Sequence, residues 1–158
     1  MTREKIVQAA IRFEGTLYVG PTHFAAMKAV VEDHTMSSEK RDKILLYAED
    51  GFVTSFGRFV GREEAYQLAK DNQQIVGRFN DAEFARDFSG HPQPRLDSGW
   101  VQENYASVGF SDIEPLYERS HTASLEERAQ LEEQINVLFK LMALRSPNLT
   151  QRIDSVLS

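Results

Sequence analysis

The sequence predicts an α+β protein: a small antiparallel sheet flanked by two helices, with a C-terminal helical extension. Two short apolar segments around a Glu-Gly turn predict paired strands near the N-terminus, and stretches of helical periodicity follow them. A regularly spaced apolar seam near the other end predicts the extension. Hydrophobic residues make up 41% of the 158 positions and charged residues 27%, which is typical of a globular domain with its own core.

The first predicted elements are a hairpin and a helix. Residues 5–13 alternate as a strand does, which places one set of side chains on a common face: Val7, Ala9, Ile11 and Phe13. The chain turns at Glu14-Gly15 and returns as a strand over 16–19. Gly20-Pro21 ends that strand. Thr22 then caps a helix from His23 to Asp33, whose apolar side carries Phe24, Met27, Val30 and Val31.

The next stretch predicts short elements before a second helix. Residues 34–42 are polar and charged, which favours a loop, and 43–47 predict a strand. Asp50-Gly51 is a turn signal, and residues 52–54 predict a short strand after it. The second helix runs from Glu63 to Asn72, with two acids in its first turn, where the helix dipole favours negative charge.

The second half of the chain is less regular until its last long helix. Glycines and prolines punctuate residues 77–121, so we expect only short elements there, including one or two helical turns from Asp81 to Phe88. Thr122 or Ser124 can cap the long helix, which ends at Ser146-Pro147 before a final short helix. Its apolar seam is either intramolecular core or an oligomer contact: Leu131, Ile135, Leu138 and Met142.

Composition excludes several classes of function. The chain has no cysteine, so disulfides, thiolate nucleophiles and cysteine-based zinc sites are ruled out. The net charge is −6, with the acidic excess in residues 81–158, and no basic stripe suits duplex nucleic acid. We find no signal peptide and no 18-residue apolar run, and therefore expect a cytoplasmic protein that binds no membrane.

The strand-to-helix corner at residues 54–62 is the best candidate for a ligand site. Arg58 and Arg62 bracket an apolar pair there, and the planar guanidinium matches phosphate oxygens. Phe56, or an aromatic residue of the tail, is the candidate for stacking on a base, and His23 can donate at a helix start. Phe59 is the fifth candidate ligand-binding residue. The alternative is structural: the arginines pair with neighbouring glutamates, the phenylalanines belong to the core, and His23 has no function.

We expect no enzyme activity, no catalytic residue, no metal and no cofactor. The sequence has no nucleophile elbow, no phosphate-binding glycine loop and no histidine spacing typical of a metal site. Two alternatives stay open. One is a nucleotide-cleaving enzyme with His23 as general base. The other is a protein-binding inhibitor that covers a basic surface with the acidic tail.

Residues 4–76 resemble the phage Thoeris anti-defence sponge family, the first type described. The resemblance begins with the strand at residues 6–11 and the Gly20-Pro21-Thr22-His23 break. Its most specific part is Gly51-Phe52-Val53-Thr54-Ser55, then Gly57-Arg58-Phe59-Val60-Gly61-Arg62-Glu63-Glu64-Ala65. A final stretch is Asn72-Gln73-Gln74-Ile75.

The resemblance implies a non-catalytic sponge. Such proteins bind cyclic ADP-ribose-type signals, and some bind cyclic oligonucleotides, in the cytoplasm of the infected bacterium without cleaving them. It also implies a homodimer or homohexamer. We therefore expect residues 1–80 to form a ligand-binding core of sheet and helices, 81–121 an irregular aromatic-rich excursion packed on it, and 122–158 a helical tail that is a possible oligomerisation element.

Overall fold

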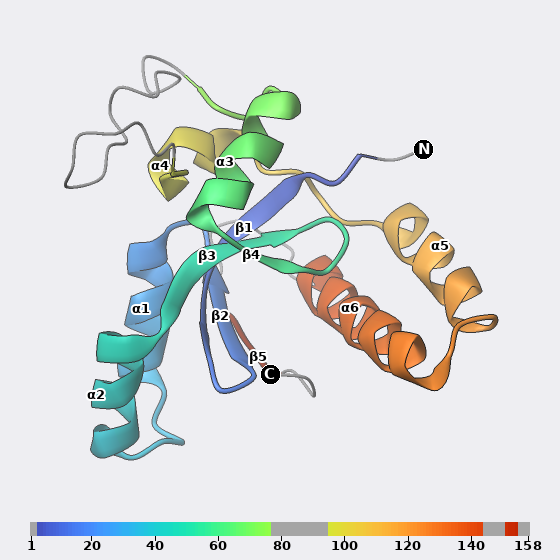
Figure 1. The fold of residues 1–158 in the computed structure, drawn as a ribbon. Helices are drawn as coiled ribbons and strands as arrows, with labels where there is room; N and C mark the ends of the chain where they lie inside the picture. Colours follow the sequence, from blue (N-terminus) through green and yellow to red (C-terminus); the bar gives the residue numbers. More distant parts are fainter. Residues whose placement is uncertain (1–2, 77–94, 144–150, 155–158) are drawn as a thin grey trace.

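The computed structural model describes residues 3–76, 95–143 and 151–154 as one antiparallel sheet between two layers of helices (Figure 1). The strand order is β4-β3-β1-β2-β5. One face of the sheet packs against α5 (Phe110–Ser120) and α6 (Leu125–Ala143), and the other against α1 to α4. This arrangement confirms the predicted α+β class and the C-terminal helical extension.

The N-terminal hairpin forms as predicted. β1 (Ile6–Phe13) and β2 (Thr16–Gly20) pair antiparallel, and Phe13 lies opposite Thr16. Both turn residues have positive φ, 47° at Glu14 and 78° at Gly15. Positive φ at both central residues matches a turn whose twist suits the two strands.

β1 is the central strand, and both of its faces are buried. The prediction that Val7 shares a face with Ala9 and Ile11 is wrong. A register shift between Ile6 and Gln8 in the pairing with β3 places one extra residue there. Val7 therefore packs with the cluster under α6, whereas Ala9 and Ile11 pack toward the other helical layer.

Helix α1 (His23–Glu32) begins where the sequence predicts, but buries a different face. The Thr22 side chain accepts a hydrogen bond from the Ala25 N–H, which caps the helix. The buried residues are His23, Ala26 and Val30. Phe24 and Val31 were predicted on the apolar side, yet they are exposed, because α1 packs on the sheet through its smaller side chains.

Helix α2 (Ser38–Tyr47) replaces the strand predicted for residues 43–47 and most of the loop predicted for 34–42, of which only residues 34–37 stay outside regular structure. Ser37 caps it by accepting a hydrogen bond from the Lys40 N–H. Ile44 is its buried residue and packs with the cluster against α1. Only one side chain of α2 is buried, so the apolar periodicity that would signal a helix is nearly absent from this stretch.

The predicted turn at Asp50-Gly51 is instead part of β3 (Glu49–Thr54), which pairs with β1 and with β4 (Phe59–Gly61). A Cβ atom on Gly51 would lie 2.1 Å from the Val60 carbonyl oxygen and 2.6 Å from the Phe59 ring. Gly51 is therefore required by a close approach to β4 rather than by a turn.

The predicted helix from Glu63 to Asn72 is α3 (Arg62–Asp71), with Glu63 and Glu64 in its first turn. Between residues 95 and 121 the structure adds α4 (Ser98–Val101), the 3-10 turn η3 (Gln102–Asn104) and α5. The expectation of only short elements there is wrong for the eleven-residue α5. The turn expected from Asp81 to Phe88 lies outside the described residues.

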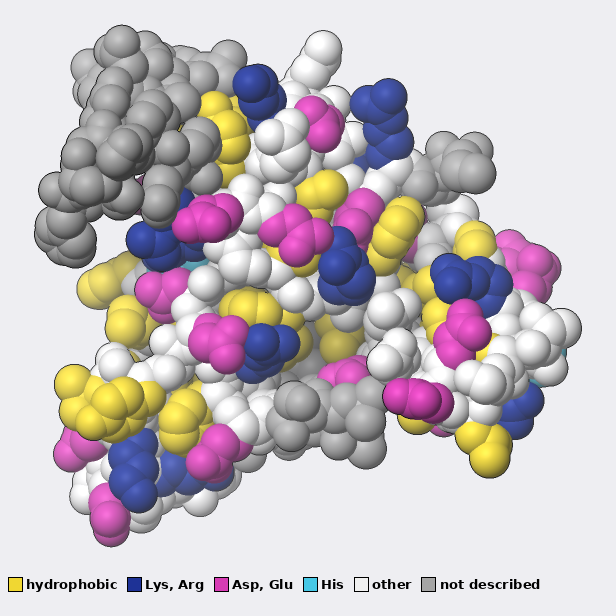
Figure 2. Space-filling model, viewed as in Figure 1, with side chains coloured by type: hydrophobic (Ala, Val, Ile, Leu, Met, Phe, Trp, Pro, Cys, Tyr) yellow, Lys and Arg dark blue, Asp and Glu magenta, His cyan; other side chains and the backbone are white. Residues whose placement is uncertain are grey.

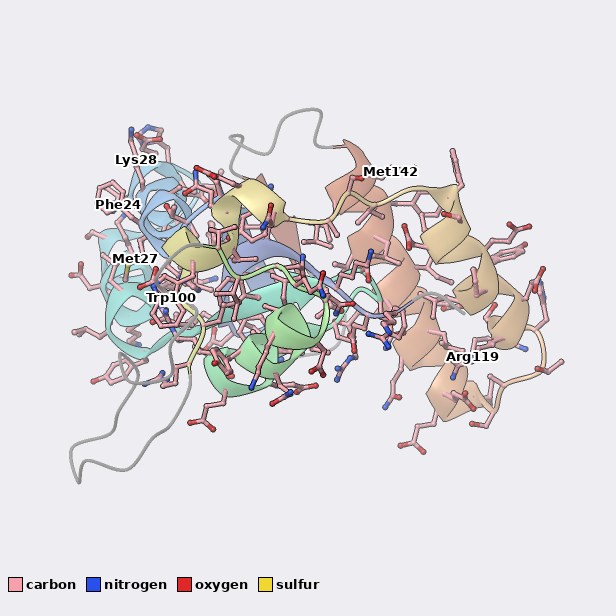
Figure 3. All side chains as sticks on the ribbon, turned by 90° about the horizontal axis from the view of Figure 1, so that it is seen from above. Phe24, Met27, Lys28, Trp100, Arg119 and Met142 are labelled. Atoms are coloured by element: carbon pink, nitrogen blue, oxygen red, sulfur yellow. The ribbon has the colours of Figure 1, made fainter. Side chains whose placement is uncertain are left out.

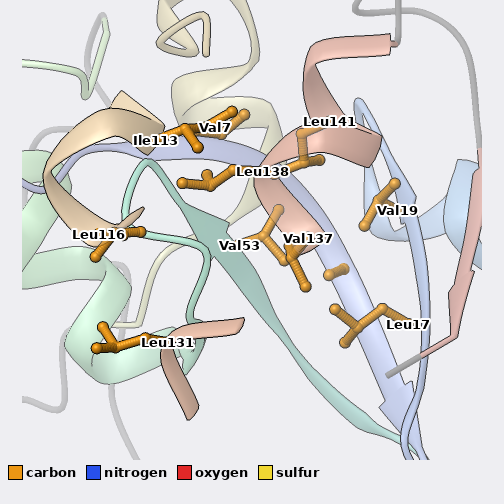
Figure 4. Close-up of a cluster of buried hydrophobic side chains, with 11 residues drawn as sticks. Val7, Leu17, Val19, Val53, Ile113, Leu116, Leu131, Val137, Leu138 and Leu141 are labelled. Carbon is orange, nitrogen blue, oxygen red and sulfur yellow. The ribbon is translucent and has the colours of Figure 1, made fainter. Parts of the chain in front are cut away.

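Helix α6 forms as predicted, and Ser124 caps it by accepting from the Glu127 N–H. Leu131 and Leu138 are buried in the cluster that joins α6 to the sheet (Figure 4), while Ile135 and Met142 pack against that cluster. The seam thus contributes to the intramolecular core. Residues 151–154, where a final short helix was expected, form β5 (Gln151–Asp154) paired with β2.

None of the helices in the described ranges has the length and apolar character needed to span a lipid bilayer. The division of the chain into three parts stays a prediction.

Candidate functional site

Arg58 lies in the hairpin between β3 and β4 and is held by two carboxylates. Its Nε and Nη2 donate to the two oxygens of Glu4 at 2.7 and 2.8 Å, and Nη2 also donates to Glu64 at 2.7 Å. These hydrogen bonds raise the pKa of Arg58 above its ordinary value, against a smaller effect of burial. The Thr54 hydroxyl donates to the same Glu4 carboxylate at 2.6 Å. The two acids already balance the charge of Arg58 locally.

The two phenylalanines of the predicted ligand site lie in different surroundings. Phe56 is half-buried in the hairpin turn, where its N–H donates to the Thr54 hydroxyl oxygen. Phe59 faces the α6 side of the sheet, packs against the cluster there, and carries the Arg12 guanidinium 4.4 Å from its ring centre. Arg12 is itself paired with Glu49 at 2.8 Å. Phe59 therefore serves the core and a cation–π contact.

His23 lies on the opposite face, at the first residue of α1. Its ring packs edge-to-face on Phe52 with centroids 4.9 Å apart, and Nε2 lies 2.7 Å from the Gly51 carbonyl oxygen. Because a carbonyl oxygen only accepts, Nε2 carries the proton. Burial lowers the pKa of His23 and the nearby Arg62 lowers it further, against the opposing effects of the Gly51 carbonyl, Asp50 and Asp97. The imidazole is therefore neutral at pH 7.

Arg62 is the first residue of α3 and reaches the same part of the sheet as His23. Its Nη1 donates to the Leu96 carbonyl oxygen at 3.1 Å, and Nη2 lies 3.7 Å from Asp50, too far for a hydrogen bond. The Leu96 N–H returns a hydrogen bond to the Arg62 carbonyl. Within the described residues, Arg62 is thus much less satisfied by acids than Arg58, although only 20% of its side chain is exposed.

Two of the five predicted residues are brought together. His23 and Arg62 both contact the Asp50-Gly51 step of β3. Both also contact residues 96–98: the main-chain N–H of His23 donates to the Ser98 hydroxyl at 3.3 Å, and the Arg62 side chain donates to the Leu96 carbonyl oxygen. We name this group the β3 corner: His23, Asp50, Arg62, Leu96 and Ser98. Arg58 and Phe56 lie in the neighbouring hairpin turn, and Phe59 lies on the other side of the sheet.

Sequence reasoning missed the partners that complete these contacts. Leu96 and Ser98 come from a stretch expected to be irregular, and Glu4 precedes the first strand. Asp97 was the available signal for α4: its carboxylate accepts from the Gly99 N–H, a recognisable cap two residues before a glycine. No local pattern indicates that Glu4 meets Arg58, since 54 positions separate them.

The buried, neutral His23 makes the stability of the fold depend on pH. The pKa of His23 is lower when folded than in the unfolded chain, so the unfolded state binds more protons as the pH falls below the ordinary histidine value of 6.5. We expect the free energy of unfolding to be constant above about pH 7 and to fall toward pH 5. Urea unfolding across this range measures it. The His23→Gln variant should have a flatter profile; an unchanged slope would contradict the assignment.

Within the residues that the structure describes, no group of three or more histidine, aspartate and glutamate side chains is placed to hold a metal ion. The β3 corner combines the Arg62 guanidinium with a neutral imidazole, the Asp50 carboxylate 3.7 Å from that guanidinium, and two hydrogen-bonding segments of main chain. An anionic group could meet the guanidinium there only by taking the place of Asp50 beside it.

A family model described as phage T4 y16D protein matches residues 5–92, which is more than half of the 158-residue chain. The match includes the whole sheet except β5, together with α1 to α3. No curated protein and no solved structure matches the chain significantly.

Proposed function

The chain belongs to the phage T4 y16D protein family, and on that premise we propose that it sequesters a nucleotide immune signal of the infected host. The signal is of the cyclic ADP-ribose or cyclic oligonucleotide type, and the protein holds it without cleaving it. The resemblance to Thoeris sponges over residues 4–76 falls almost wholly inside the matched range and supplies this ligand class. The site of action is the host cytoplasm.

The observation that carries the proposal is the state of Arg62. A nucleotide of this kind brings phosphate charge, which a guanidinium binds through paired N–H groups. The side chain of Arg62 makes one hydrogen bond in the described structure, to the Leu96 carbonyl oxygen, and its contact with Asp50 is loose. A phosphate oxygen can take the place of that loose contact. The low exposure of Arg62 strengthens such a pair, because water screens it less than it would a surface pair.

His23 supports Arg62 from beside it. As a neutral ring tied to Gly51, it adds no second positive charge and fixes the backbone on which Asp50 is carried. The hydrogen bond from the main-chain N–H of His23 to the Ser98 hydroxyl joins the start of α1 to the segment that Arg62 contacts. The corner is thus held in place before any ligand arrives, which lowers the entropic cost of binding.

Substituting Arg62 tests the proposal. We expect Arg62→Ala to weaken the affinity for a phosphorylated cyclic nucleotide roughly 10- to 100-fold, because a charge-assisted hydrogen bond is lost. Isothermal titration with a panel of cyclic ADP-ribose isomers and cyclic di- and trinucleotides measures it. Arg62→Lys keeps the positive charge but lacks the planar guanidinium, so its affinity should lie between those of the wild type and Arg62→Ala.

Two arginine variants act as matched controls. Arg119→Ala removes an exposed arginine of α5 and should leave the affinity unchanged. Arg58→Ala should lower stability by exposing Glu4 and Glu64 to each other, with little effect on affinity if Arg62 is the phosphate contact. If instead Arg58→Ala abolishes binding and Arg62→Ala does not, the ligand lies at the hairpin turn.

The fate of the ligand separates holding from cleavage. The protein is incubated with the ligand, heated to release it, and the supernatant is analysed by mass spectrometry. Intact ligand supports sequestration, and a converted product shows an enzyme. No binding to any member of the panel would contradict the proposed function.

A further inference from the structure

Asp50 faces Arg62 across the end of the β3–β4 pairing. Gly51 lies opposite Gly61 in that antiparallel register, so the same register continued by one residue sets Asp50 opposite Arg62. Residues that face each other on neighbouring strands have Cβ atoms roughly 4.5–5.5 Å apart. The backbone therefore keeps the carboxylate of Asp50 beside the guanidinium of Arg62, whether or not the two side chains touch.

The main chain at Asp50 is held from two sides. Asp50 lies opposite Ile11 in the pairing of β3 with β1, and the carbonyl of the next residue, Gly51, accepts from Nε2 of His23 at 2.7 Å. The Asp50 side chain is 44% exposed, against 20% for Arg62. When an anion approaches Arg62, the carboxylate can therefore turn toward water, but the backbone keeps it within the β3 corner.

A second acid adds to the negative charge near this corner. Burial lowers the pKa of His23, whereas Asp50 and Asp97 both act to raise it, so both carboxylates are close enough to act on the same ring. The ionised side chains that act on His23 are thus one cation, Arg62, and two anions. On the face seen in Figure 2, the described Lys and Arg side chains are interleaved with Asp and Glu rather than gathered into one basic patch. The charge that a ligand meets at the corner is therefore set locally.

We propose that Asp50 is a specificity-determining residue that admits a phosphate with one negative charge and disfavours a phosphate with two. This inference rests on the proposed function, because it concerns the phosphate that Arg62 binds. An internal phosphate, linked on both sides as in a cyclic nucleotide, carries one negative charge, whereas a terminal phosphate carries close to two at pH 7. Arg62 supplies one positive charge, so the second negative charge of a terminal phosphate lies uncompensated beside the carboxylate and is repelled by it.

Such a selection separates the cyclic signal from linear nucleotides. AMP and ATP end in a terminal phosphate, and so does the linear dinucleotide that forms when water opens one phosphodiester of a cyclic dinucleotide. A site that binds phosphate through an arginine alone attracts all of these ligands. A carboxylate fixed beside the arginine raises specificity by repelling the wrong ligands more than the right one.

Two ligands that differ by one charge test the selection. 5′-AMP carries a terminal phosphate, and its methyl ester carries the same phosphate as a singly charged diester. Each is titrated as a competitor of a cyclic nucleotide from the panel that binds the wild type. We expect the ester to compete about 10-fold better than 5′-AMP with the wild type, because Asp50 repels the extra charge. With Asp50→Asn, which keeps the size of the side chain and removes its charge, the two should compete within about 3-fold of each other.

One further variant and one control accompany the test. Asp50→Ala also removes the charge and should lose the selection in the same way. Glu118→Gln removes an exposed carboxylate of α5 and should keep the wild-type ratio. Figure 3 places its neighbour Arg119 at the opposite end of the molecule from Phe24 and Lys28 of α1. Circular dichroism checks that each variant is folded, which is expected because the substituted side chains are partly or fully exposed.

The outcomes separate this inference from the proposed function. If the cyclic nucleotide binds but the ratio of the two competitors is the same in the wild type and in both Asp50 variants, the role of Asp50 is overturned and sequestration stands. Failure of 5′-AMP to compete better with Asp50→Asn than with the wild type overturns it too. If no cyclic nucleotide of the panel binds the wild type, the proposed function falls, and the role of Asp50 falls with it.

Discussion

Gly51→Ala is expected to destabilise the protein by about 3 kcal/mol, at the upper end of the usual range for adding a methyl group to a packed interior. The new Cβ would meet the Val60 carbonyl oxygen at 2.1 Å and the Phe59 ring at 2.6 Å. A ring can move, but a backbone oxygen of the partner strand cannot do so without breaking the β3–β4 pairing. The change also strains the segment that carries the acceptor of His23.

Gly61 is the natural control for this prediction. It lies directly opposite Gly51 in the β3–β4 register, and a Cβ there would meet nothing within 4 Å. Gly61→Ala should cost no more than about 1 kcal/mol, chiefly because alanine is a poorer helix cap at the start of α3. Urea unfolding monitored by circular dichroism compares the two. Equal destabilisation would show that the close approach at Gly51 is not the cause.

The elements that the sequence predicts well are those with local signals. The β1–β2 turn has two residues with positive φ, Glu14 and Gly15, and the Glu-Gly pair between two apolar segments predicts it. Thr22 caps α1 with its own side chain, and the acids at the start of α3 mark a helix N-terminus. In each case a few adjacent residues determine the conformation.

The elements that it misses depend on distant partners. β5 exists because β2 offers an edge to which Gln151–Asp154 can pair, some 130 positions away. α2 buries a single residue, so its pattern carries almost no apolar period. The Asp50-Gly51 pair is typical of a turn, but the need for glycine at position 51 comes from the close approach of Val60 on the next strand. Tertiary contacts override local preference in all three.

The candidate site shows the same division. The pairing of two arginines with a helix start at residues 58–62 is visible in the sequence, and so is His23 after a Gly-Pro break. The sequence does not indicate which of the two arginines is paired with carboxylates, because that pairing depends on Glu4 reaching Arg58 across the fold. The charge available to a ligand is therefore decided by a contact between segments that no local spacing relates.

Leu138→Ala is expected to lower stability by about 2–5 kcal/mol, because the side chain is fully buried where α6 joins the sheet and its loss leaves a cavity. Phe139→Ala, one position further along α6, removes a larger side chain that is 45% exposed and should cost about 1 kcal/mol or less. The contrast distinguishes a helix packed on the sheet from a detached tail. If both variants unfold at the wild-type urea midpoint, α6 contributes nothing to the core. If the two variants differ as expected, deleting residues 122–158 would remove part of the fold. Loss of activity on that deletion would then not by itself identify the acidic tail as a protein-binding element.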